Sequence, residues 1–290
     1  ITYNDGRGTP APFWWRTMIK DTLQVTMSDL HSGSNYALFL PSLWRGTNNN
    51  SHMPGGCQIK IRKHFEKFAG EVLAARKNKR VRLVINGDSL DGDHHHSGDV
   101  CSLDERDQAD IHIELMQEFQ KRINWQRGDE IYYTRGTQSH VHQMETYIGE
   151  QMGAVMDGDF YIFDLLKLDT NGVMFWFVHH GPTAGEGANE GNGLRNWLKR
   201  HVEDCTKDKT RPADVIYTGH VHSPTYNTCV YRERMKWKTI HGVILPSWQA
   251  KTTYAWMKAP IKKNKIGGVY QTVFADGTIG IPQFSVMGYE

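Results

Sequence analysis

Five short, largely apolar runs, each ending at an aspartate or a histidine, constrain the fold of this chain more than any other feature of its sequence. The clearest covers residues 81–85 and stops at Gly87 and Asp88. Such a run is typical of a strand covered on both faces, and the glycine lets the backbone turn sharply after it. The other four runs lie at residues 24–31, 131–140, 175–182 and 215–222. Because open α/β sheets place their sites outside the carboxyl ends of the strands, the five ends are predicted to converge.

Two of these ends carry pairs of residues that commonly bind metals, Asp29-x-His31 and His220-x-His222. Side chains alternate along an extended backbone, so both members of each pair point to the same side. Two ligands of one metal centre require that arrangement. A lone aspartate such as Asp88 is more typical of a helix N-cap, but the other four runs favour a metal site.

Composition sets the broad class of protein. With 290 residues, of which 39% are hydrophobic, the chain can form one large or two ordinary domains around a sizeable core. A net charge of +2 argues against a dedicated polyanion-binding surface but allows a local one. The four cysteines form no CxxC motif and are expected to be free thiols in a reducing compartment. No stretch is long and apolar enough to span a membrane, and no signal-peptide pattern is present.

Hydrophobic periodicity predicts a single domain, 1–290, in which strands and helices alternate. Helices are predicted at about 57–77, after a capping box at 102–105, at 143–152 and at 194–203. Further strands are predicted at 159–168, 173–178, 214–218, 226–234, 238–245, 269–275 and 279–286. The order strand, helix, strand before Asp88 indicates a right-handed parallel crossover.

Three loops, 32–56, 92–103 and 183–193, are long or rich in glycine and polar residues. We expect them to lie over the active site, because long loops near a site are often functional. The second loop contains the run His94 to His96. This run is either an incidental solvated stretch or a contact for substrate, with equal weight on the two interpretations.

In chain order, five motifs resemble those of the calcineurin-like metallophosphoesterase superfamily: Asp29-x-His31, Gly87-Asp88-x-x-Asp91, Gly136-Thr137-x-x-His140, His180-Gly181 and Gly219-His220-x-His222. The resemblance covers nearly the whole chain. It implies an α/β fold, a four-layer α/β/β/α sandwich of two mixed sheets flanked by helices, with a two-metal centre between the strand ends. The ligands that it implies are Asp29, His31 and His222 for the first metal, Asp88 as the bridge, and His180 and His220 for the second.

The third motif departs from the Gly-Asn-His that is usual in the superfamily and is similar to a Gly-Thr-x-x-His variant in some phage and bacterial members. His140 is therefore either the proton donor to the leaving group or the missing ligand of the second metal. His180-Gly-Pro matches the His-x-Pro pattern of the superfamily, so His180 is assigned as a ligand and His179 as a neighbour that contacts substrate. Asp91, grouped with His140 as catalytic, either orients a ligand histidine or caps a helix.

The activity that the resemblance implies is hydrolysis of phosphate esters by attack of a metal-bridging hydroxide. A phosphodiesterase or nuclease is favoured over a protein phosphatase. The alternatives are a small-molecule phosphomonoesterase, a single-metal hydrolase and a non-catalytic, metal-stabilised binding scaffold. The expected cofactors are two divalent or trivalent metal ions, manganese first and iron or zinc as alternatives, since carboxylate and imidazole ligands without cysteine suit all three. The expected location is the cytoplasm of a bacterial or phage-infected cell.

Positive residues indicate what the substrate contacts. Four cations alternate within a predicted hairpin: Arg232, Arg234, Lys236 and Lys238. Alternation would place them on one face that follows a nucleic-acid backbone, although a solvated edge strand is at least as good an interpretation. Arg135, assigned to substrate binding, and Arg195 and Lys251 are further candidates for phosphate contact, although a structural or solvated role is the favoured interpretation for each of them taken alone. Nucleic acid is thus the candidate partner beside a phosphate ester, no membrane is expected, and the oligomeric state stays open.

Overall fold

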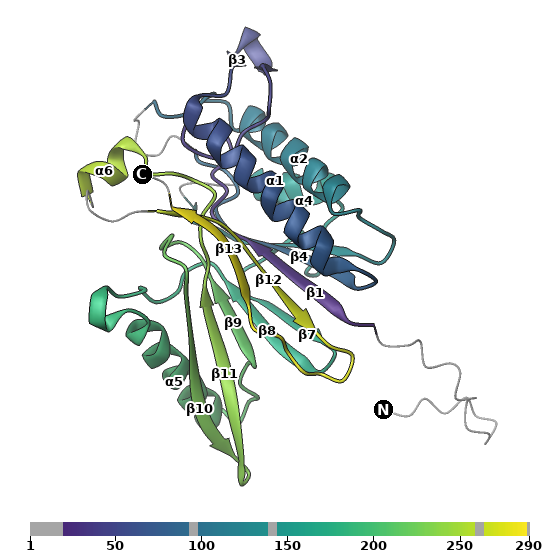
Figure 1. The fold of residues 1–290 in the computed structure, drawn as a ribbon, viewed down its shortest axis with the longest axis vertical. Helices are drawn as coiled ribbons and strands as arrows, with labels where there is room; N and C mark the ends of the chain where they lie inside the picture. The colour runs from purple at the N-terminus through teal and green to yellow at the C-terminus, as the bar shows by residue number, and fades with distance from the viewer. Residues whose placement is uncertain (1–19, 93–97, 139–143, 259–263, 289–290) are drawn as a thin grey trace, which may run out of the picture.

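Two mixed β-sheets stack face to face, and helices cover their outer faces (Figure 1). The computed structural model describes residues 20–92, 98–138, 144–258 and 264–288. The first sheet has the strand order β13 (Gln283–Gly288), β12 (Lys265–Val273), β1 (Thr22–Met27), β4 (Arg80–Asn86), β5 (Glu130–Thr134), β6 (Ile162–Phe163). The second has the order β10 (Thr225–Glu233), β11 (Lys236–Ile244), β9 (Val215–Thr218), β8 (Val173–Val178), β7 (Leu166–Thr170).

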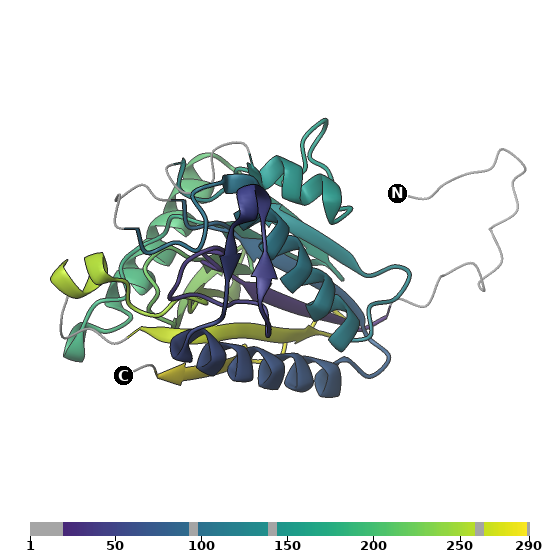
Figure 2. The same cartoon turned by 90° about the horizontal axis from the view of Figure 1, so that it is seen from above.

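The helices lie on opposite outer sides of the two sheets. The first sheet is covered by α1 (Gly56–Arg76), α2 (Glu105–Arg122) and α4 (Met144–Gln151), and α1 runs along its length (Figure 2). The second sheet is covered by α5 (Asn192–Lys207). The remaining elements are the short helix α6 (Thr253–Lys258), the small hairpin of β2 (Trp44–Arg45) and β3 (Ser51–His52), and two 3-10 turns at Thr47–Asn49 and Gly187–Asn189. This is the predicted four-layer α/β/β/α sandwich, and the fold class is confirmed.

Alternation along the strands builds three separate apolar layers. In β4, Leu83 and Ile85 pack under α1 and α2, whereas Val84 points into the space between the sheets. In β8, Phe175 and Phe177 fill the same space between the sheets and are fully buried. Burying one such side chain stabilises the fold by roughly 1.5–3 kcal/mol. The third layer lies between the second sheet and α5.

Most elements lie close to their predicted positions, and β1 and β4 pair in parallel, as predicted for the two strands of the crossover. The predicted strand at 159–168 is instead two strands, because the chain passes from β6 in the first sheet to β7 in the second. The predicted capping box at 102–105 is also wrong. Asp104 is the N-cap of α2, and its carboxylate accepts a hydrogen bond from the backbone N–H of Arg106.

The β10–β11 hairpin does not carry four cations on one face, so that prediction is wrong. Its two-residue turn has positive φ at both positions and pairs Arg232 with Trp237. Opposed residues share a face and side chains alternate along each strand, so Arg232 lies on the other face from Lys236 and Lys238. Lys238 instead pairs with Glu233 at 2.5 Å.

The prediction for the cysteines agrees with the structure. The four cysteines, Cys57, Cys101, Cys205 and Cys229, are free thiols. Among the helices of the described ranges, none has the length and apolar character needed to cross a membrane.

Candidate metal centre

Four neighbouring strand ends bring the predicted ligands together. Asp29 and His31 follow β1, Asp88 follows β4, and the pairs 179–180 and 220–222 follow β8 and β9. β1 and β4 are parallel neighbours, and so are β8 and β9, so each sheet delivers its residues at one edge. Convergence of these ends was predicted from the sequence, and the structure places the side chains within contact distance.

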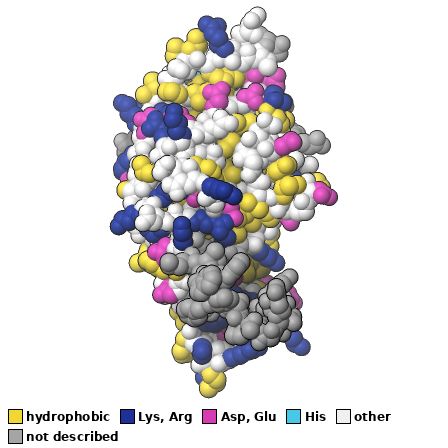
Figure 3. Space-filling view, turned by 90° about the vertical axis from the view of Figure 1, so that its right-hand side faces the viewer, with side chains coloured by type: hydrophobic (Ala, Val, Ile, Leu, Met, Phe, Trp, Pro, Cys, Tyr) yellow, Lys and Arg dark blue, Asp and Glu magenta, His cyan; other side chains and the backbone are white. Residues whose placement is uncertain are grey.

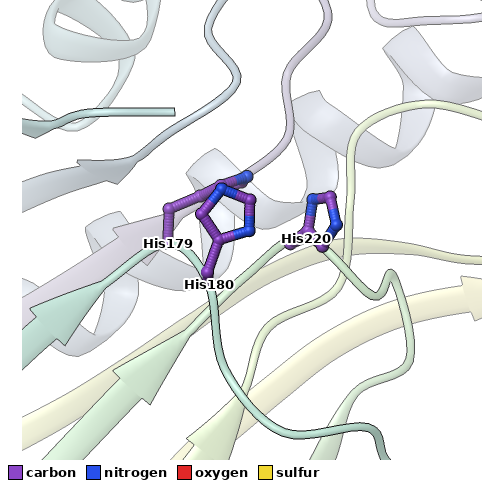
Figure 4. Close-up of side chains that lie close together, drawn as sticks. All are labelled: His179, His180 and His220. Atoms are coloured by element: carbon purple, nitrogen blue, oxygen red, sulfur yellow. The ribbon is translucent and has the colours of Figure 1, made fainter. Parts of the chain in front are cut away.

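Three overlapping groups of possible ligands form the centre, with the ligand atoms of each group within 4.8 Å of one another: Asp29, His31 and His222; Asp29, Asp88 and His179; His179, His180 and His220. Asp29 joins the first group to the second, and His179 joins the second to the third. Figure 4 shows the three histidines of the third group, His179, His180 and His220, gathered at the strand ends. All six residues predicted as ligands therefore lie in one continuous cluster, together with His179.

The backbone is strained at this cluster. Asp29, His31, Asp88, His220 and His222 all have positive φ, between 45° and 67°. This conformation is unfavourable for residues with a Cβ and persists only where the surrounding structure enforces it, commonly at functional sites. Five such residues in one cluster are better explained by a binding site than by structural capping. No sequence signal predicted this strain.

Two motif glycines allow the strand ends to approach this closely. A Cβ at Gly136 would clash with the backbone N of Asp88, and one at Gly87 would clash with the ring of His179. Gly87 also has a φ of +78°, which suits glycine. The absence of a side chain at these two glycines therefore lets the strand ends pack closely around the centre.

His179 is the most enclosed histidine of the centre, with 1% of its surface exposed. Its Nδ1 lies 2.8 Å from the carbonyl oxygen of Asn86 and must donate the proton, since a carbonyl only accepts. Its Nε2 then faces Asp88 Oδ2 at 3.0 Å and Asp29 Oδ1 at 3.9 Å. A backbone carbonyl that orients a histidine in this way is common around metal ligands.

The buried carboxylates of the centre require positive charge close to them. Burial lowers the pKa of His179, but the carboxylates of Asp29 and Asp88 outweigh it and raise this pKa to about 9. Burial acts to raise the pKa of Asp29, but His222 and His179 outweigh it and lower this pKa to about 2. Two buried carboxylates are thus balanced only by protonated imidazoles or by bound cations, and metal binding would displace those protons.

This donor set fits a metal. Carboxylate and imidazole ligands suit manganese, iron or zinc. The Nε2 of His179 is buried and lies 3.0 Å from Asp88 Oδ2, as expected for a histidine nitrogen and a carboxylate that bind the same cation. His180 and His220 are exposed, so two of the three residues of the third donor group face solvent. The number and identity of the metals stay predictions.

Asp91 lies beside His31 in the first donor group. Its Oδ1 is 3.1 Å from His31 Nδ1 and also accepts a hydrogen bond from Gln249 Nε2 at 2.7 Å. Burial lowers the pKa of His31, but the hydrogen bond and charge of Asp91 outweigh it and raise this pKa. Asp91 thus contacts His31, and the orienting role assigned to it stays a prediction. Gln249 has no counterpart among the predicted residues, because no motif surrounds it.

The third motif supports Asp88. The backbone N–H of Thr137 donates to Asp88 Oδ1 at 2.6 Å, and its hydroxyl donates to Asp88 Oδ2 at 3.3 Å. Behind it, the backbone N–H of Gly136 donates to the buried Glu145 at 3.2 Å. His140, the candidate proton donor or ligand, lies outside the described residues, as do His94 to His96. Sequence reasoning missed Glu145, since nothing in the pattern of 143–152 marks it as inward-facing.

The two residues assigned to substrate contact differ in exposure. Arg135 is about half exposed, lies directly before Gly136, and pairs with Asp164 at 2.5 Å. His179 is enclosed by the donor groups. Whether either contacts a substrate stays a prediction.

Three solved structures are similar to this chain at low identity. They are the sulfate thiohydrolase SoxB of Thermus thermophilus (10% identity, 93% of this chain and 57% of SoxB covered, TM-score 0.37), a Thermotoga maritima protein solved by NMR (14%, 92% and 99%, 0.32), and the 5'-nucleotidase of Candida albicans (10%, 91% and 51%, 0.32). The chain thus spans little more than half of SoxB and of the nucleotidase. No family model and no curated protein matches the sequence. TM-scores of 0.32 to 0.37 support no inference about activity.

Proposed function

We propose that this chain is a metal-dependent phosphoesterase of the calcineurin-like type, with two metal ions in its centre. Its substrates are phosphate esters, with diesters or nucleic acids favoured over phosphoproteins. The observation that carries the proposal is the continuous chain of three donor groups, linked through Asp29 and His179. A single structural metal needs one closed set of about four ligands, whereas overlapping sets suit two adjacent ions.

The clustered residues are proposed to have separate roles in metal binding. Asp29, His31 and His222 would hold one ion, and His179 or His180 with His220 the other, with Asp88 between them. Bound metal ions would supply Lewis-acid activation of both water and the phosphoryl group. Thr137 fixes the carboxylate of Asp88 through both of its oxygens.

The exposure of His180 and His220 favours diesters as substrates. A phosphodiester has two organic substituents on its phosphate, and an exposed side of the centre leaves room for the second one. His140 is proposed to donate a proton to the leaving group, or else to complete the second metal site.

The test is metal content and ester hydrolysis measured on the same preparation. Protein is stripped with a chelator, Mn²⁺ is added back, and hydrolysis of bis-p-nitrophenyl phosphate is compared with that of p-nitrophenyl phosphate. Mn²⁺-dependent cleavage of the diester at the higher rate is expected. Faster cleavage of the monoester would point to a small-molecule phosphomonoesterase. Two bound metals without hydrolysis of either ester would contradict the enzyme and favour the binding scaffold.

A further inference from the structure

A groove of about 660 Å³ lies between α5 and the edge strand β10, where the two elements run side by side (Figure 1). The residues that define this α5–β10 groove are Arg195, Lys199, Glu203, Asn227, Val230 and Tyr231. No ligand of the metal centre is among its described lining residues. The groove is therefore a separate surface.

The strand wall of the groove begins at the sheet edge that carries the metal centre, because Thr225 pairs with Ile244 and Ile244 pairs with Thr218, two residues before His220. The segment after His180 leads into α5, and β10 begins at Thr225, three residues after His222. The side-chain amide of Asn227 donates to the carbonyl of Gly191 at 3.0 Å and ties the two walls together at this end. From there the groove runs away from the centre, over roughly 12 Å of α5 at about 1.5 Å per residue.

Charge along the helical wall is arranged by distance from the centre. Arg195 and Lys199 are exposed and follow one another by one helical turn, about 6 Å apart along the axis. Glu203, the acid among these residues, comes one turn further on, at the far end. The part of the groove nearest the metal centre is thus the positive part.

The strand wall offers different chemistry. Tyr231 lines the groove and packs against the apolar layer under α5, whereas the side chain of Val230, which is 60% exposed, alternates to the other face of β10. β10 is an edge strand, paired among the described strands with β11 alone. A groove with cations on one wall and the aromatic ring of Tyr231 on the other suits a single-stranded nucleic acid, whose phosphates and bases face opposite sides. By contrast, Lys and Arg are interspersed with Asp and Glu on the face shown in Figure 3.

We infer that the α5–β10 groove binds a single strand of nucleic acid that continues from the phosphate held at the metal centre. The substrate class is then an oligonucleotide or longer chain rather than a mononucleotide. This inference rests on the proposed phosphoesterase function. It adds to that function a binding surface outside the metal centre, with Arg195 and Lys199 as the two cations that contact the phosphates of the bound strand.

The first test is salt-dependent binding. The double variant Arg195→Gln/Lys199→Gln is compared with a control, Lys63→Gln/Lys67→Gln, which removes two exposed charges from α1 on the other sheet. Binding of a labelled single-stranded DNA of about 12 nucleotides, a length within the range of single-strand-binding sites, is measured in chelator so that no turnover occurs. Each phosphate contact contributes about 0.7 to the slope of log K against log salt, so the groove variant should lose about 1.4. The control should keep the slope of the unmodified protein.

The second test measures how much more efficiently the protein cleaves an oligonucleotide than a small diester. The ratio of kcat/KM on the oligonucleotide to kcat/KM on bis-p-nitrophenyl phosphate should fall about tenfold in the groove variant, which corresponds to 1.4 kcal/mol. An unchanged ratio with an unchanged salt slope overturns the groove assignment. An acidic peptide, added at the same concentration of negative charges as the DNA, is the competitor. If this peptide displaces the DNA, the groove assignment is also overturned and a protein partner is indicated. If the slope changes but no ester is hydrolysed, the proposed enzyme fails while the groove stands.

Discussion

His179 Nε2 lies 3.0 Å from Asp88 Oδ2, and both side chains are almost completely buried. The adjacent His180 is exposed, so two consecutive histidines lie in very different environments within one cluster. Because the Nδ1 proton of His179 is held by the Asn86 carbonyl, its Nε2 is free to bind a cation. Between His180 and the other described residues, no hydrogen bond imposes such a constraint.

Because of this difference in burial, we predict that His179 contributes more to metal binding than His180 does. We expect His179→Asn to lower metal content and to reduce hydrolysis of any ester by at least about 100-fold, as for a lost ligand and its support. His180→Asn should keep most of the metal. Metal analysis after gel filtration, together with bis-p-nitrophenyl phosphate hydrolysis, checks both variants. The opposite ranking would restore the sequence-based assignment of His180 as the principal ligand.

Asp88 is the carboxylate proposed to bridge the two metal ions. An amide in its place keeps the shape but loses the charge, so Asp88→Asn should lose both metals and activity together. Ser89→Ala is the matched control, since Ser89 is buried next to Asp88 and is no part of the donor groups. Two metals retained at full activity in Asp88→Asn would contradict the bridging role.

Asp91 is predicted to act through His31. Asp91→Asn should lower metal affinity by about 10- to 100-fold, because orienting partners of ligand histidines typically contribute that much. Competition for Mn²⁺ with a fluorescent chelator measures the affinity without turnover. Asp99→Asn, a change in the same region of the chain, is the comparison. Equal affinity in the two variants would return Asp91 to a helix-capping or purely structural role.

The sequence predicted the layers and the convergence of strand ends, because runs that stop at Gly-Asp or at Asp-x-His fix where a strand must end. It assigned His180 rather than His179 as the ligand from the resemblance of His180-Gly-Pro to a family pattern, because alternation could not separate the two histidines. Residues 175–178 are all apolar, so the alternation that would have shown which side faces the other sheet is hidden. In the structure Phe175 and Phe177 point between the sheets, and His179 continues that side.

The hairpin error has a comparable origin. Four alternating cations share a face only within one strand, and a two-residue turn changes which residues lie opposite one another. Turn length depends on local φ preferences, and Arg234 and Met235, which adopt positive φ, are not typical residues for such a turn. The contacts of Glu145 and Gln249 were likewise beyond prediction, since each depends on tertiary packing between distant segments.

Glu145 is predicted to make stability depend on pH. Burial, followed by smaller contributions that include the charge of Asp88, raises the pKa of its carboxyl from 4.5 to about 7. The folded chain therefore keeps a proton that the unfolded chain releases, and stability is lost as pH rises from about 4.5 through about 7. The loss amounts to about 3 kcal/mol, at 1.36 kcal/mol per pKa unit. Glu145→Gln removes the charge and can still accept the hydrogen bond from Gly136.

Urea unfolding of chelated protein at pH 5 and pH 8 measures this effect without interference from metal binding. We expect Glu145→Gln to be close to the unmodified protein at pH 5 and more stable by up to about 3 kcal/mol at pH 8. Glu150→Gln, an exposed change on the same helix, should shift stability by no more than about 0.5 kcal/mol at either pH. If Glu145→Gln keeps the pH dependence of the unmodified protein, the carboxyl is already charged in the folded state, and the positive charge that stabilises it must come from the centre beside it.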